Sequence, residues 1–234
     1  MSSNTIVLLI LSFVFFVSEY FFTYKKTNLM DRLTQFIKDI PFFCFNTIIP
    51  AYLIKTIFFY YISFLHWASP GYVPLLEGFE LSAGLLFFIG FLISDFVGYM
   101  THRFLYHKKL WILHRMHHSS KVVRWHSSFR FNPLELALTT SLIYIIYSLL
   151  GIPKYLFYDL LIFNYFINYM AHSELPIGNK YIEKILVTPN YHRVHHSVDI
   201  NNQRSNYAGV FTIWDRMFCS VNDTPLKNMK LGIK

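Results

Sequence analysis

The chain has 234 residues, of which 54% are apolar and only 15% charged, and its formal net charge is +8 at pH 7. This composition is too apolar for an ordinary soluble domain and favours an integral membrane protein. The two cysteines, Cys44 and Cys219, lie in an apolar run and near the C-terminus, and they predict no disulfide framework.

Two apolar stretches with a basic segment between them form the N-terminal third. The first stretch, 5–23, is long enough to span a bilayer, and neither its flanks nor a cleavage site suggest a cleaved signal peptide. The second stretch covers 41–67. Segment 24–40 predicts a short helix lying at the membrane interface, with a solvated linker as the alternative. The apolar face of this helix comprises Leu29, Leu33, Phe36, Ile37 and Ile40.

Three further apolar stretches follow, at 81–100, 134–151 and 154–171. Only the short sequence "GIP" separates the last two, which predicts a helical hairpin whose members are slightly short of the roughly 20 residues of a full span. The expected fold is therefore all-α, a membrane bundle of about four to five apolar helices with a histidine-rich cap on the cytoplasmic side.

The basic residues are distributed unevenly between the loops. With the N-terminus outside, the segments 24–40, 101–133 and 172–234 lie inside and hold four, seven and eight of the 21 Lys and Arg residues. The outside loop 68–80 holds none. This positive-inside pattern predicts a multi-pass topology and accounts for the charge without nucleic acid as a partner.

Histidines dominate the two larger inside segments. The pattern H-x-x-H-H occurs twice, in "HRMHH" and in "HRVHH". On a helix, positions i, i+3 and i+4 share a face, so each copy predicts a fan of rings that could cap one side of a metal ion or of a pair of ions. The fans comprise His114, His117 and His118, and His192, His195 and His196.

A third histidine group, His102 and His107, follows the apolar stretch 81–100 directly. Five residues turn an ideal helix by roughly 140°, so the two rings either reach different metals or the helix ends between them. His172 ends the last apolar stretch, in one stripe with Asn164 and Asn168. A polar stripe in a membrane helix faces protein or a cavity rather than lipid.

The ligand set indicates the kind of centre. Nine imidazoles without cysteine are too many for one ion and suit two, and nitrogen-rich sites suit Fe, Zn or Cu. The E-x-x-H pairs of soluble di-iron bundles are absent. Asp95, inside the stretch 81–100, needs a partner, which we expect to be the N–H of a metal-bound imidazole. Asp215 is either a similar partner or structural.

The sequence around these histidines resembles that of the fatty acid hydroxylase/sterol desaturase superfamily, over about residues 90–220. "DFVGYMTHRFLYHKKLWILHRMHHSS" is similar to the family's first histidine region, and "TPNYHRVHHSVD" and "NYAGVFTIWDRMF" are similar to its last. Where the family often has a histidine, in R-F-H-P-L-E, this chain has Asn132. Asn132 is then a neutral ligand or a hydrogen-bond partner of one, and His126 either replaces the missing ring or is structural.

The resemblance implies a membrane-embedded, non-haem di-iron oxidoreductase that uses O2 on lipid C–H bonds. It also implies two Fe ions, a separate redox partner as external electron donor, a catalytic domain at 81–234, and N-terminal membrane helices at 1–80. The ligand roles carry over to His102, His107, His114, His117, His118, His172, His192, His195 and His196.

Other readings remain open from the residues. Within the family, hydroxylation or desaturation of an aliphatic lipid is favoured over oxidation of a sterol or a carotenoid. The expected walls of the substrate slot are the helices 81–100 and 134–171, with polar contacts from Tyr99, Tyr144, Tyr165 and Tyr169. A membrane metal transporter would carry ligands along its spans, and a haem cytochrome would use axial histidines rather than fans.

Overall fold

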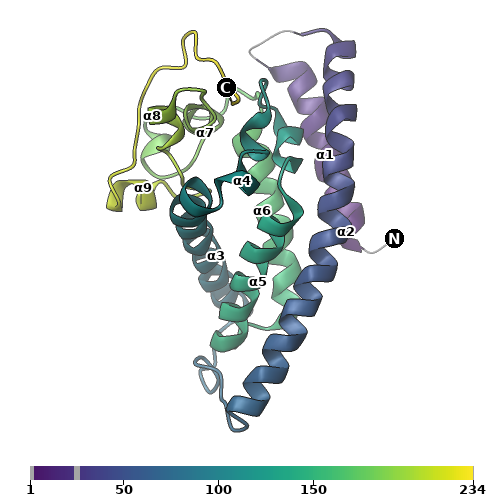
Figure 1. The fold of residues 1–234 in the computed structure, drawn as a ribbon, viewed down its shortest axis with the longest axis vertical. Helices are drawn as coiled ribbons and strands as arrows, with labels where there is room; N and C mark the ends of the chain where they lie inside the picture. Colours follow the sequence, from purple (N-terminus) through teal and green to yellow (C-terminus); the bar gives the residue numbers. More distant parts are fainter. Residues whose placement is uncertain (1–2, 24–26, 234) are drawn as a thin grey trace.

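The computed structural model describes residues 3–23 and 27–233, and within these ranges every regular element is a helix. Two isolated β-bridges, Leu186 with Phe211 and Ser197 with Leu231, join loops. Figure 1 shows the long helices side by side and the short C-terminal helices gathered at one end of them. The all-α prediction is therefore confirmed. The long helices are α1 (Ser3–Phe22), α2 (Leu29–Ala68), α3 (Ala83–Met100), α5 (Pro133–Leu150) and α6 (Lys154–His172).

The first departure from the expected elements is α2. It is one helix of 40 residues, with the Asn28 side chain capping its N-terminus, rather than a short interfacial helix followed by a separate span. At 1.5 Å per residue it is about 60 Å long, twice the hydrocarbon thickness of a bilayer. The linker alternative for 24–40 is wrong for residues 29–40, and residues 24–26 lie outside the described part of the chain.

In the N-terminal half of α2, two charged side chains face inward and several large apolar ones face outward, beside the exposed Asp31 and Lys38. Arg32 and Asp39 are buried, whereas Met30 and Ile37 are 68% and 60% exposed. Phe36 is the member of the predicted apolar face that packs inward, against Trp125. The large apolar side chains on the outer face favour contact of that face with lipid.

Two helical segments of the described chain, Ala83–Lys109 and Pro133–Leu150, are long and apolar enough to cross a membrane. They correspond to two of the five stretches expected from the sequence. Together with the composition they support a membrane protein, while the full number of spans stays a prediction.

The predicted hairpin is present as α5 and α6. The chain turns at Gly151, whose φ of +84° lies in the left-handed region that glycine favours. A Cβ there would also lie 2.9 Å from the Cβ of Pro74, in the loop after α2. The hairpin packs with α3 around a core that includes Phe91, Tyr147 and Leu160.

The histidine-bearing loops and short helices, residues 110–132 and 173–233, form what we call the cap. It contains α4 (Trp111–His114), α7 (Pro189–His195), α8 (Ile200–Gln203) and α9 (Ile213–Met217), and it lies at one end of the long helices (Figure 1).

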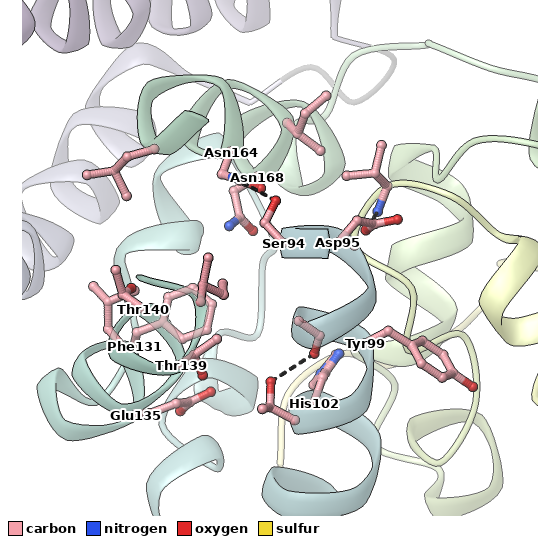
Figure 2. Close-up of a pocket in the computed structure, with 18 of the residues that line it drawn as sticks. Ser94, Asp95, Tyr99, His102, Phe131, Glu135, Thr139, Thr140, Asn164 and Asn168 are labelled. Carbon is pink, nitrogen blue, oxygen red and sulfur yellow. Dashed lines mark hydrogen bonds between the residues drawn. The ribbon is translucent and has the colours of Figure 1, made fainter. Parts of the chain in front are cut away.

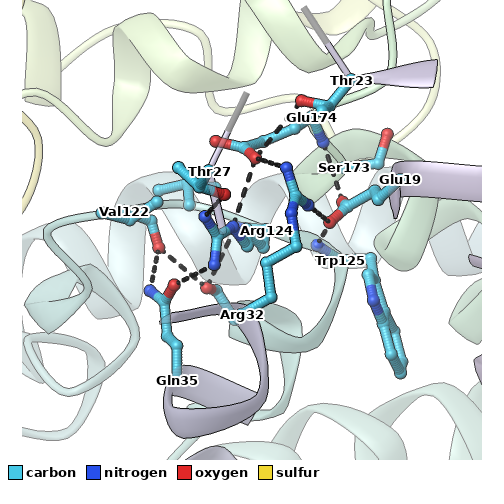
Figure 3. Close-up of polar contacts among 12 residues, drawn as sticks. Glu19, Thr23, Thr27, Arg32, Gln35, Val122, Arg124, Trp125, Ser173 and Glu174 are labelled. Atoms are coloured by element: carbon cyan, nitrogen blue, oxygen red, sulfur yellow. Dashed lines mark hydrogen bonds and ion pairs between the residues drawn. The ribbon is translucent and has the colours of Figure 1, made fainter. Parts of the chain in front are cut away.

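Buried charges attach the cap to the N-terminal helices (Figure 3). Glu19 of α1 accepts hydrogen bonds from the backbone N–H groups of Trp125 and Glu174, at 3.0 and 2.8 Å. Glu174 in turn accepts from Arg124 at 3.2 Å and from Arg32 of α2 at 3.5 Å. Because buried charges are tolerated only when they are paired, this cluster fixes the cap over α1 and α2.

Candidate metal centre

The nine histidines predicted from the motifs lie together and are divided into two groups, within each of which the ligand atoms lie within 4.8 Å of one another. Each H-x-x-H-H motif contributes to both groups instead of forming one fan. The five-histidine group comprises His102, His107, His114, His118 and His195. The four-histidine group comprises His117, His172, His192 and His196.

The helix geometry explains why His102 and His107 share a group. The chain from Thr101 to Lys109 is a π-helix that continues α3. A π-helix closes i→i+5 hydrogen bonds, so residues five apart lie on one face. The two ring centroids are 4.9 Å apart. The expectation of separate metals or of a helix end between them, which assumed α-helical geometry, is therefore wrong.

Hydrogen bonds fix the direction in which several rings point. His102 Nδ1 donates to the carbonyl oxygen of Tyr207, and His195 Nδ1 donates to that of Ser205, both at 2.7 Å. In the neutral ring, each Nε2 then carries a lone pair. These two Nε2 atoms nevertheless face each other at 3.0 Å.

Two lone pairs at that distance repel unless a cation lies between the rings, so the donor set fits a metal ion. Nitrogen ligands about 2.1 Å from a metal and at right angles to each other are about 3.0 Å apart. The four-histidine group has the same form. His172 Nδ1 donates to the carbonyl of Asn168, and its Nε2 lies 3.1 and 3.2 Å from the Nε2 atoms of His117 and His192.

Burial keeps the rings of the cap neutral, which is the form that binds a metal. Desolvation, and then the proximity of the other imidazoles, holds each pKa well below the ordinary value of histidine. This applies to His114, His117, His118, His192, His195 and His196.

The predicted partner of Asp95 is wrong. Its carboxylate accepts hydrogen bonds from the backbone N–H groups of Val210 and Phe211, at 2.9 and 3.1 Å, and from the indole N–H of Trp214 at 2.7 Å. These donors come from the loop before α9 and from α9 itself. Asp95 therefore attaches the cap to α3 instead of orienting a ligand.

Asp215 holds the same loop from the cap side. It accepts from the Tyr191 hydroxyl, from the backbone N–H groups of Tyr207 and Ala208, and from the Ser220 hydroxyl. Tyr207 is the residue whose carbonyl receives the N–H of His102. Asp215 thus acts on a candidate ligand through one backbone segment.

Asn132, which replaces the histidine of the family's R-F-H-P-L-E pattern, and His126 both lie outside the two histidine groups. Asn132 caps α5, accepting from the backbone N–H of Leu134 at 3.0 Å. His126 is buried, and its Nδ1 contacts a carboxylate oxygen of Asp39 at 2.6 Å. Because the His126 ring is buried in a pair with the carboxylate of Asp39, its role is structural. His126 therefore does not replace the missing histidine.

Sequence reasoning missed Glu135. It is 3% exposed, and its Oε1 lies 2.6 Å from Nδ1 of His114. A carboxylate that accepts this N–H directs Nε2 of the ring toward a metal. A lone glutamate in the first turn of an apolar stretch was the available signal, because such a charge must find a buried partner.

A cavity of about 220 Å³ adjoins the histidines and is lined by residues of α3, α5 and α6, some of which Figure 2 shows. These are the helices expected to form the substrate slot. Both histidine groups reach it, the five-histidine group through His102 and His114 and the four-histidine group through His117 and His192. Of the four expected tyrosines, Tyr99, Tyr144 and Tyr165 line it. Tyr169 instead packs against Trp125 and Phe129, beside α1.

Comparisons with known proteins point to one family. Alkylglycerol monooxygenase of Danio rerio is 35% identical over 133 residues, which are 56% of this chain and 29% of that protein. The human alkylglycerol monooxygenase is 35% identical over 129 residues, 55% of this chain and 28% of that protein. Ornithine lipid hydroxylase OlsE of Rhizobium tropici is 29% identical over 138 residues, 58% and 42% of the two chains.

These alignments cover less than half of each relative's length, and no solved structure matches the chain. The family model described as fatty acid hydroxylase matches residues 87–220. That range contains all nine histidines of the two groups, together with Asp95, Glu135 and Asp215. The chain therefore belongs to the fatty acid hydroxylase family.

Proposed function

We propose that the chain is a membrane-bound, non-haem di-iron oxidoreductase that uses O2 to hydroxylate, or desaturate, an aliphatic C–H bond of a lipid. The observation that carries the proposal is the meeting of two histidine groups, both fitted to a metal ion, with an apolar cavity between membrane helices. Family membership gives the same reaction class.

The nine histidines would hold two iron ions, which supply O2 activation when bound. The protein's own contribution is to keep the imidazoles neutral, to orient them through backbone carbonyls and Glu135, and to exclude water by burial. Electrons would come from a separate redox partner.

The favoured substrate is an aliphatic lipid that enters the cavity from the bilayer. The names of two kinds of relative include a lipid, which is alkylglycerol in one and ornithine lipid in the other. Most of the cavity walls are apolar and aromatic, as a methylene chain requires. These walls include Ile143, Tyr147, Phe157, Leu160 and Leu161. Oxidation of a sterol or a carotenoid is the alternative.

Expression of the chain in cells is expected to add one oxygen to an acyl or alkyl lipid, or to remove two hydrogens from it. Comparative lipid mass spectrometry of cells with the wild-type chain and with the His195→Ala variant measures this. Loss of hydrogen from a sterol, or oxygen gained by a carotenoid, would replace the substrate class. An identical lipid profile in the two strains would reject the enzymatic function.

We also propose that the histidine-rich cap faces the cytoplasm, with residues 81–234 as the catalytic domain and 1–80 as N-terminal membrane helices. The support is the placement of 19 of the 21 basic residues in segments on one side. The loop around Glu77 would then lie on the opposite side of the membrane from Lys227.

Cysteine labelling tests this topology. Cys44 and Cys219 are both free and exposed, so the background carries serine at both positions. In that background, Glu77→Cys is expected to react with a membrane-impermeant maleimide in intact cells, whereas Lys227→Cys reacts only after permeabilisation. Labelling of both from outside would reject the topology.

A further inference from the structure

The carboxyl group of Glu135 has one engaged oxygen and one without a partner. Oε1 contacts His114, whereas Oε2 is buried and has no hydrogen-bond partner in the described part of the chain. Glu135 lines the cavity, beside Thr139 on the next turn of α5 (Figure 2). A buried carboxylate oxygen without a donor is costly, so a donor is expected to come from what fills the cavity.

Nearby hydroxyl groups are already engaged elsewhere. The Tyr106 hydroxyl contacts the backbone carbonyl of Glu135 at 2.9 Å and the Thr139 hydroxyl at 2.6 Å. The Thr101 hydroxyl donates to carbonyls of its own helix. The free oxygen thus belongs to a residue that lines the cavity, whose lining is mostly apolar.

A second buried pair in the same protein shows what a purely structural carboxylate looks like. Asp39 accepts from His126 on one oxygen and from Arg130 on the other, each at 2.6 Å. Both of its oxygens are satisfied within the protein, and it lines no cavity found beside the histidine groups. Glu135 differs by leaving one oxygen for a ligand.

We propose that Glu135 is a specificity-determining residue that connects the metal centre to the substrate. Oε1 positions His114 within the five-histidine group, and Oε2 accepts a hydrogen bond from a hydroxyl group of the bound lipid. The favoured substrates therefore carry a hydroxyl group close to the carbon that is oxidised. This inference rests on the proposed function and extends it to the recognition of the lipid.

Binding of two matched lipids tests the role of Oε2. The probes are radiolabelled hexadecylglycerol and its dimethyl ether, which keeps the chain but loses both hydroxyl hydrogens. Partition into micelles with and without the iron-loaded protein, in the absence of O2, gives the two affinities. Wild-type protein is expected to bind the diol about tenfold more tightly, because the ether leaves the buried acceptor Oε2 without a donor.

Glu135→Gln separates the two roles. Its amide oxygen can still accept from His114, which leaves the N–H2 group facing the cavity as a donor. The iron content is then expected to stay at the wild-type level, while the preference for the diol is lost or reversed. Glu135→Leu removes both functions and is expected to lose about one of the two irons, because His114 belongs to one group only.

Asp39→Asn is the matched control, since it neutralises a carboxylate in the other buried imidazole pair. It is expected to keep both the iron and the lipid preference. A Glu135→Gln variant with normal iron and an unchanged preference would overturn the inference and leave the proposed function standing. Wild-type protein without iron would instead reject the proposed function. Equal loss of iron in Asp39→Asn and Glu135→Leu would reduce Glu135 to a structural role.

Discussion

His195→Ala is expected to lower the iron content from about two to about one per chain and to reduce lipid oxidation by at least about 100-fold. His195 belongs to the five-histidine group, and its Nε2 lies 3.0 Å from that of His102. Loss of a residue that merely orients a ligand typically costs 10–100-fold, so loss of a ligand is expected to cost at least as much. Iron analysis and lipid mass spectrometry measure the two effects.

The companion variant His117→Ala tests the other group. It is expected to remove the second iron while leaving the five-histidine group loaded, with the same loss of activity. His66→Ala is the control, because His66 is exposed in the last turn of α2 and belongs to neither histidine group. Wild-type activity in His195→Ala would contradict the ligand assignment. A Soret band in the purified wild-type protein would show haem in place of a di-iron centre.

The nine histidines predicted as ligands lie together in the structure, and they could be singled out because their signal in the sequence is local. H-x-x-H-H and the lone His172 are recognisable from spacing and from their position at the ends of apolar stretches. The hairpin of α5 and α6 was equally readable, since a glycine and a proline separate two apolar runs of helical length. Composition indicated a membrane protein, and the apolar stretches of helical length indicated the all-α fold.

The division of the histidines into two groups was not predicted, because it depends on which elements the fold brings together and, for His102 and His107, on a departure from α-helical geometry. The π-helix at Thr101–Lys109 turns His107 toward His102. Between His114 and His117 the chain leaves the α-helix, and a 3₁₀ turn follows at His117–Ser119. In both motifs the first and last histidines, four residues apart, share a group and the histidine between them joins the other group, also where His192 and His195 lie in the α-helix α7.

The partners of the buried carboxylates were also beyond local reasoning. Asp95 was expected to contact a histidine, but its donors come from residues more than 100 positions away in the sequence. Glu135 contacts His114 across a loop that contains the structural ring of His126. A sequence shows that such a charge needs a partner, and the tertiary fold decides which one.

The second large effect is expected from Asp215→Asn, which should lower the free energy of unfolding of the cap by about 3 kcal/mol. The carboxylate accepts from four donors that come from α7, from the backbone at Tyr207 and Ala208, and from Ser220. An asparagine side chain turns one acceptor into a donor, so at least one buried N–H or O–H group loses its partner. For a chain of this length the melting temperature should fall by roughly 6–12 °C.

Thermal unfolding of the purified protein in detergent measures this fall, and Asp223→Asn is the matched control because Asp223 is exposed. The effect should extend to the metal centre, since Asp215 holds the backbone N–H of Tyr207, whose carbonyl orients His102. Weaker iron retention is therefore expected in Asp215→Asn, together with lower stability, and in the control neither should change. If Asp215→Asn melts like the wild type and keeps its iron, the loop before α9 is held by other contacts, and Asp215 has no role in orienting His102.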